Sequence, residues 1–306
     1  MLYPYMEAPS VMDHRELARL LWDAATEWRT DKAGRLAAAL SLYALLALAP
    51  LLWLVIAVAA QVVGQDAAAG QIVAPLHEWV GSEAATAIQT VVAGVITAQP
   101  RTTATLLSIA TFLFAASHLF AELKSALNTI WNVRRSSEGS VLDWLRTRAL
   151  ACLSVIGSAL VLGLALSVDT ALMTMTQYLG VGALAARGQA LLTLAGVTLA
   201  FGVLSLLSAV IYKLLPDATI AWRDVGIGAL VTAGLLLAGQ GLIGWYLRHS
   251  QVSAAFGPLG SFMALMLWIL FSSQIVLFGA EFTWVYANRY GSHVLPAPDA
   301  EISQPT

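Results

Sequence analysis

The chain has 306 residues, of which 58% are hydrophobic and only 11% are charged, with a formal net charge of −2. An ordinary soluble domain has roughly 25% charged residues, so this balance excludes a single soluble globule. Apolar runs long enough to cross a bilayer recur along most of the length, which predicts an all-α, polytopic membrane protein. The near-neutral charge gives no reason to expect a nucleic-acid partner. The single Cys152 excludes an intramolecular disulfide and a cysteine-based metal cluster.

Residues 1–35 are predicted to form a cytoplasmic tail that contains one amphipathic helix. Between Asp13 and Arg29 the apolar residues recur on one face and the charges lie on the other, and Asp13 suits the N-cap position. Such a helix either lies in the membrane interface or packs on the cytosolic ends of other helices. The two arrangements are compatible.

The membrane domain is predicted to cover residues 36–290 and to contain six transmembrane helices. Each comes from an apolar run that meets the requirement of about 20 residues for a span. Pro50 should kink the first span and free a backbone carbonyl. The fifth span is rich in glycine, for which close helix packing is the first explanation and a moving hinge the second. The predicted spans are 36–63, 102–131, 149–168, 189–212, 225–247 and 261–284.

Two segments outside the spans carry their own predictions. Residues 64–101 begin with glycine, aspartate and proline breakers and then resume an amphipathic pattern that includes Glu78 and Glu83. This pattern predicts a surface helix on the extracytoplasmic side, with a re-entrant segment as the alternative. Residues 291–306 contain three prolines and no periodicity, which predicts a disordered C-terminal tail.

The distribution of lysine and arginine predicts that both termini are cytoplasmic. An even number of spans puts the two termini on one side, and positively charged residues gather in cytoplasmic segments. With the N-terminus inside, only three of the 16 basic residues fall outside, namely Arg101, Arg187 and Arg248. The sequence therefore predicts a multi-pass membrane protein with both termini on the cytoplasmic side.

A polar stripe in the second span marks the first candidate site. The stretch SHLFAELKSALNTIW places His118, Glu122, Ser125 and Thr129 on one face of a helix, with Asn128 beside them. Lipid would not tolerate this face, so it must meet other helices, water or headgroups. His118 also suits a hydrogen-bonded packing role, and Asn128 suits an anchor at the inner end of the helix.

The sixth span carries the second candidate site. Gln274 precedes Glu281 by seven residues, so the two lie on nearly the same face of the helix. A carboxylate within the bilayer invites a proton, a cation or a basic partner. The alternative for Glu281 is a structural role, as a helix cap or in a salt bridge with Lys124 or Arg223. From the first span, Ser41, Tyr43 and the carbonyl freed by Pro50 are predicted to line the same cavity.

Four stretches of the chain resemble the YihY/BrkB family of bacterial inner-membrane proteins, whose members were once labelled ribonuclease BN. The resemblance extends from about Asp31 to Gly291, with one departure at Phe256, where the family usually has tyrosine. The stretches are DKAGRLAAALSLYALLALAP, FAELKSALNTIWNV, YKLLPDATIAWRDVGIGAL and FGPLGSFMALMLWILFSSQIVLFGAEFTWVY. The resemblance implies a multi-pass protein of the bacterial inner membrane, with six helices and cytoplasmic termini. It also implies transport or export, variously connected with lipid or envelope-precursor movement, ion or toxicant tolerance, and serum resistance.

The residues favour a transporter over an enzyme. The five histidines are scattered and show no metal-binding spacing, so ribonuclease activity is not expected. We predict a transporter or flippase-like exporter of a lipid-like or amphipathic substrate, without a cofactor. Because GxxxxGK[ST] is absent, coupling would be to protons or cations, or movement would be downhill. The predicted partners are membrane lipids and a possible second copy of the chain. The alternative is a non-transporting scaffold of an envelope complex.

Overall fold

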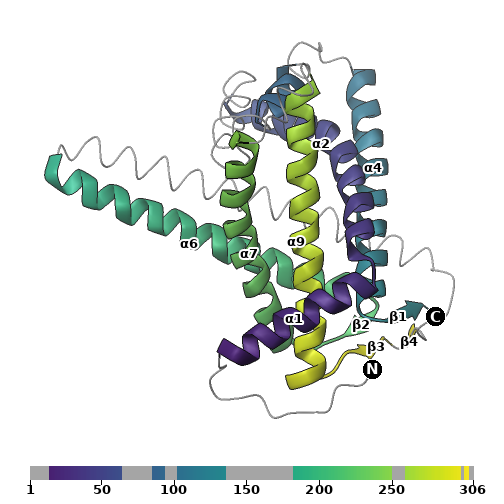
Figure 1. The fold of residues 1–306 in the computed structure, drawn as a ribbon. Coiled ribbons are helices and arrows are strands. Elements are labelled where there is room, and N and C mark those ends of the chain that lie inside the picture. Colours follow the sequence, from purple (N-terminus) through teal and green to yellow (C-terminus); the bar gives the residue numbers. More distant parts are fainter. Residues whose placement is uncertain are drawn as a thin grey trace. The chain divides into compact units, whose positions relative to one another are not determined.

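The computed structural model describes residues 14–63, 85–93, 102–135, 182–249, 259–297 and 300–302. Most of them are helical, as the composition predicts (Figure 1). In chain order the named helices are α1 His14–Thr30, α2 Ala33–Val63, α4 Thr102–Ile130, α6 Gly182–Leu214, α7 Trp222–His249 and α9 Gly260–Tyr290. A further helical segment covers residues 85–93.

The long helices confirm a polytopic helical membrane protein. Among the described residues, three segments are long and apolar enough to cross a bilayer: Leu194–Leu214, Trp222–Tyr246 and Gly260–Tyr290. At about 1.5 Å per residue, the 31 residues of α9 extend about 46 Å, beyond a hydrocarbon core of about 30 Å. The ends of α9 therefore reach past the apolar layer.

Several predicted boundaries are close to the observed ones, and others lie outside the described residues. The predicted amphipathic helix is α1, and the predicted first, second, fourth, fifth and sixth spans correspond to α2, α4, α6, α7 and α9. The predicted third span, 149–168, falls outside the described residues, so the count of six stays a prediction. Most of residues 64–101 also lie outside the described residues, so the predicted surface helix stays a prediction. The helix α2 continues through position 50, and the side chain of Pro50 is outside the described set.

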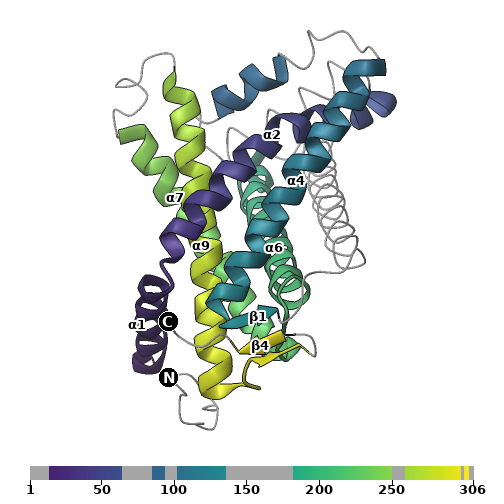
Figure 2. The same ribbon diagram turned by 90° about the vertical axis from the view of Figure 1, so that its right-hand side faces the viewer.

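The C-terminal tail corrects the sequence prediction, because residues 291–306 are not disordered throughout. Strand β3, Leu295–Pro296, pairs antiparallel with β2, Ala218–Thr219. Strand β4, Ala300–Ile302, pairs antiparallel with β1, Val133–Arg135. Figure 2 shows β1 and β4 side by side. In this register Arg134 lies opposite Glu301, and opposite charges across a strand pair stabilise it.

Two residues with a left-handed backbone conformation, Lys32 and Asn132, follow the ends of helices. Asn132 follows α4 with a φ of 54°, and its amide donates to the Thr129 carbonyl at 3.1 Å. Asparagine tolerates this conformation better than most residues, because its short polar side chain can bond locally. Lys32 has the same φ and separates α1 from α2. At both positions only two residues separate consecutive elements.

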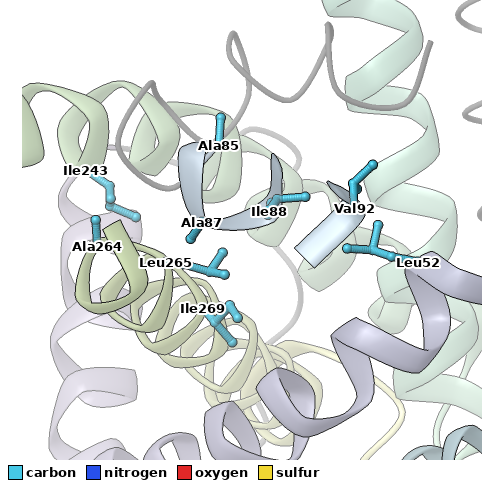
Figure 3. Close-up of a cluster of buried hydrophobic side chains, with 9 residues drawn as sticks. All are labelled: Leu52, Ala85, Ala87, Ile88, Val92, Ile243, Ala264, Leu265 and Ile269. Atoms are coloured by element: carbon cyan, nitrogen blue, oxygen red, sulfur yellow. The ribbon is translucent and has the colours of Figure 1, made fainter. Parts of the chain in front are cut away.

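The chain divides into two compact units. The described residues of the first are 14–24, 127–135, 182–234 and 279–302. The described residues of the second are 25–63, 85–93, 102–126, 235–249 and 259–278. The core of the second unit is a cluster of buried aliphatic side chains (Figure 3). It joins Leu52 of α2, segment 85–93, Ile243 of α7 and the first half of α9, and its members are Leu52, Ala85, Ala87, Ile88, Val92, Ile243, Ala264, Leu265 and Ile269.

In the first unit, α7 and α9 meet through reciprocal glycine and threonine residues. A Cβ added at Gly228 would lie 1.8 Å from the hydroxyl oxygen of Thr283. A Cβ added at Gly279 would lie 1.9 Å from the hydroxyl oxygen of Thr232. Each threonine donates to the carbonyl of the glycine four residues before it, Thr232 to Gly228 at 2.8 Å and Thr283 to Gly279 at 2.7 Å. Both hydroxyls are thus satisfied within their own helices while the two backbones approach closely.

The junction between α1 and α2 gives a pH-dependent prediction. Burial, with a smaller contribution from Glu27, raises the pKa of Asp31 from 3.8 to about 6. The folded state therefore holds this proton more tightly than the unfolded state, and stability should fall as pH rises from about 4 to 6. We expect Asp31→Asn to raise the thermal midpoint of the purified protein at pH 7.5 and to leave it unchanged at pH 4. Because the carboxyl is partly exposed, the gain should be at most about 1 kcal/mol. Equal shifts at both pH values would contradict this account.

Candidate functional site

Glu281 is the most deeply buried ionisable side chain of the candidate site. It lies on α9 with a relative exposure of 0%, between the buried Ala280 and Phe282. The indole nitrogen of Trp131, which follows α4, donates to the carbonyl oxygen of Ala280 at 3.3 Å. Trp131 is itself 2% exposed. The end of α4 therefore covers α9 beside the carboxylate.

Tyr212 brings α6 and α7 to the same place. Its hydroxyl lies 3.1 Å from the hydroxyl of Thr232, which accepts the bond because its own proton goes to Gly228. A Cβ at Gly279 would lie 2.8 Å from the Tyr212 oxygen, so this hydroxyl touches the α9 backbone two residues before Glu281. The Tyr212 ring meets Trp131 edge-on, with centroids 6.4 Å apart. Groups from the end of α4, from α6 and from α7 thus contact this part of α9.

The sequence singled out Glu281 and Asn128 in this unit but missed Tyr212, Thr232 and Thr283. Single hydroxyls in an apolar helix are inconspicuous, because they can bond to a carbonyl of the preceding turn. One usable signal was present. Glycine and threonine recur at i and i+4 in both α7 and α9, the spacing of a helix-packing face.

A second polar layer joins the helix ends to the tail. Asp224, in the first turn of α7, is buried and accepts hydrogen bonds from the Ser292 amide at 2.7 Å and the Ser292 hydroxyl at 2.8 Å. The amide of Ala221 in turn donates to the Ser292 hydroxyl at 3.0 Å. Lys213, at the end of α6, donates to the Ile220 carbonyl. These bonds hold the start of the tail, at Ser292, against the start of α7.

Asn128 binds the turn between α6 and α7. Its amide nitrogen donates to Asp217 Oδ2 at 3.0 Å, and its carbonyl oxygen accepts from the Asp217 amide at 2.9 Å. We expect Asn128→Ala to lower the free energy of unfolding by about 1–3 kcal/mol, because both bonds are lost in a partly buried place. Thermal unfolding in detergent measures this, with the exposed Ser125→Ala as the matched control. Equal midpoints for the two variants would leave Asn128 without an anchoring role.

The remaining predicted site residues belong to the second unit. Ser41 is buried and donates to the Ala38 carbonyl at 2.8 Å. Tyr43 stacks on His118 at 5.8 Å between centroids, and His118 Nδ1 lies 2.9 Å from the Phe114 carbonyl oxygen. The structure thus brings together Tyr43 and His118. The predicted site residues of this unit differ in exposure. His118 and Ser125 are exposed, whereas Tyr43, Glu122 and Gln274 are half-buried.

The polar stripe of α4 is partly open in the described structure. His118, Ser125 and Thr129 are exposed, whereas the opposite face of the helix is buried. His118 Nδ1 donates a hydrogen bond to the Phe114 carbonyl oxygen, which makes Nε2 the acceptor of a neutral imidazole. Within the described residues, no three histidine, cysteine, aspartate or glutamate side chains gather into a possible metal site.

Comparison with known proteins gives the family of the chain. It is 26% identical to a UPF0761 membrane protein of Alkalilimnicola ehrlichii over 60% of this chain and 40% of the relative. For the UPF0761 membrane protein of Tolumonas auensis, the identity is 28% over 54% of this chain and 52% of the relative. For that of Methylibium petroleiphilum, it is 28% over 61% of this chain and 42% of the relative. The match thus spans about half or less of the length of these relatives.

No solved structure matches the chain. The profile of the family described as "Virulence factor BrkB" matches residues 24–303. This range includes α2, α4, α6, α7 and α9 and both strand pairs. The protein is therefore an integral membrane protein that belongs to the BrkB family.

Proposed function

We propose that the protein transports an amphipathic, lipid-like substrate across the bacterial inner membrane. The observation that carries the proposal is the complete burial of Glu281 within an apolar helix of 31 residues. Burial of an ionised carboxylate costs several kcal/mol, so an ionisable residue inside a span is expected to serve a function. Binding of a proton or a cation at Glu281 would supply the coupling.

The exposed polar stripe of α4 supports a lipid-like substrate. It places the imidazole of His118 and the hydroxyl of Ser125 on the outside of a mostly apolar helix, with Tyr43 stacked beside the imidazole. A polar headgroup could follow such a stripe while its acyl chains stay in lipid. A contact with a second copy of the chain is the other use for this surface, which makes a homo-oligomer the competing explanation.

The proposed orientation has both termini in the cytoplasm. In the first unit the tail pairs with β1 and β2, next to the end of α6 and the start of α7. Basic residues gather at this end, including Arg134, Lys213, Arg223 and Arg289. The positive-inside rule supports a cytoplasmic position for such an end.

Lipid movement in liposomes tests the proposal. The full chain is reconstituted with a fluorescent phospholipid, and movement between leaflets is followed by chemical quenching of the outer leaflet. We expect Glu281→Gln to slow movement by at least about tenfold, or about 1.4 kcal/mol in the barrier. The matched control is Glu301→Gln, which removes an exposed carboxylate in β4.

Each outcome decides between explanations. Equal rates for Glu281→Gln and the parent would remove Glu281 from the pathway. A parent protein that moves no phospholipid and no other amphipathic probe would favour the scaffold of an envelope complex. Gel filtration of each variant separates loss of activity from loss of folding.

A further inference from the structure

Helix α1 carries a basic and aromatic stripe on its outer face. Arg15, Arg19 and Trp22 recur at i, i+4 and i+7, so they lie on one side of the helix. All three are exposed, and Trp22 has a relative exposure of 74%. Thr26 and Arg29 continue the same spacing along the helix and are also exposed. A large exposed indole between arginines is unusual for a surface that faces only water.

The side of α1 opposite the stripe contains its two buried residues. Leu20 and Ala24 are fully buried. Asp23, on the flank between the two faces, accepts a hydrogen bond from Arg289 of α9 at 2.6 Å, within a salt bridge. The carboxylate of Asp23 is thus turned toward α9, whereas Arg15 and Arg19 lie on the exposed side of α1. This sorting leaves an outer face of one sign of charge.

Two connections hold α1 at the level of the membrane surface. Only Asp31 and Lys32 separate it from α2, and two residues reach at most about 7 Å. Arg289, its partner on α9, lies in the last turn of a helix that is longer than the hydrocarbon core. The two connections therefore keep α1 close to the membrane surface, where the headgroups of anionic phospholipids are available to its outer face.

We propose that the stripe of Arg15, Arg19 and Trp22 binds the headgroups of anionic phospholipids. Guanidinium groups form paired hydrogen bonds with phosphate oxygens, and indole rings favour the boundary between headgroups and acyl chains. A basic residue near an anionic membrane surface contributes an association factor of about fivefold. The stripe binds the headgroup of a resident lipid, so it is separate from any path taken by a transported substrate.

Lipid binding by the full-length protein tests this proposal. The delipidated protein in detergent is titrated with phosphatidylglycerol or with phosphatidylcholine, and native mass spectrometry counts the bound lipids. We expect the parent to prefer phosphatidylglycerol. The double variant Arg15→Gln with Arg19→Gln should weaken its tightest phosphatidylglycerol site by about five- to twentyfold. Phosphatidylcholine binding should not change.

Two matched variants sharpen the test. Arg15→Lys with Arg19→Lys keeps the charge and should retain most of the phosphatidylglycerol binding. Arg134→Gln removes an exposed arginine outside α1 and should leave the affinity of the tightest phosphatidylglycerol site unchanged. The proposal is overturned if the glutamine variant binds phosphatidylglycerol as the parent does, or if it loses both lipids equally. Unchanged lipid binding with loss of a co-purifying acidic protein would assign the stripe to a protein partner instead.

Discussion

Gly279→Ala is expected to prevent normal packing of α7 against α9. The added Cβ would lie 1.9 Å from the hydroxyl oxygen and 2.9 Å from the Cβ of Thr232, and 2.8 Å from the Tyr212 oxygen. The Thr232 atoms lie next to the α7 backbone, so rotation of a side chain cannot relieve the overlap and the helices must separate. Overpacking usually costs about 1–3 kcal/mol, and we expect the upper end or more here. Thermal unfolding in detergent and the yield of monodisperse protein measure the effect.

Gly228→Ala should behave in the same way, because its Cβ would lie 1.8 Å from the Thr283 hydroxyl oxygen and 2.7 Å from the Thr283 Cβ. The matched control is Gly226→Ala, two residues earlier on α7, where nothing lies within 4 Å of the added Cβ. Adding Thr283→Gly to Gly228→Ala removes the overlap and should recover part of the loss, since residues in contact are energetically coupled. Additive effects of the two substitutions would contradict the proposed contact.

The sequence predicted the helices because the bilayer allows few alternatives. A long apolar run must satisfy its backbone hydrogen bonds internally, so its pattern alone indicates a helix. The four strands gave no such signal. They contain two or three residues each, and β1 pairs with residues more than 160 positions away. Period-two alternation cannot be recognised over so short a distance, and Pro296 argued against a strand.

The candidate site was predictable only where a residue type contradicted its surroundings. Glu281 stood out as a carboxylate in an apolar helix, and the structure buries it completely. The glycines of α7 predicted close packing, which the contact at Gly228 confirms, while Gly226 shows that not every glycine there has this role. Trp131 is the last residue of the polar stretch in the second predicted span. Its bond to the α9 backbone depends on a turn at Asn132 that no periodic pattern encodes.

Trp131→Ala is expected to be among the most destabilising single substitutions in the first unit. The indole is 2% exposed, packs edge-on against Tyr212 and donates to the Ala280 carbonyl. Loss of a buried tryptophan side chain costs about 3–5 kcal/mol, from lost contacts and from the cavity that remains. Because the cavity would open beside Glu281, water could reach a carboxylate that the parent shields.

Trp131→Phe separates the two contributions, because it keeps most of the ring volume and removes only the hydrogen bond. We expect a loss of about 1 kcal/mol for the phenylalanine variant, and the larger loss only for alanine. Trp222→Ala is the control: this tryptophan is 58% exposed, so its removal should leave the thermal midpoint nearly unchanged. If Trp131→Ala unfolds at the same temperature as Trp222→Ala, the end of α4 does not hold α9. In that case the burial of Glu281 depends on α6 and α7, whose Tyr212 and Thr232 contact the same turn.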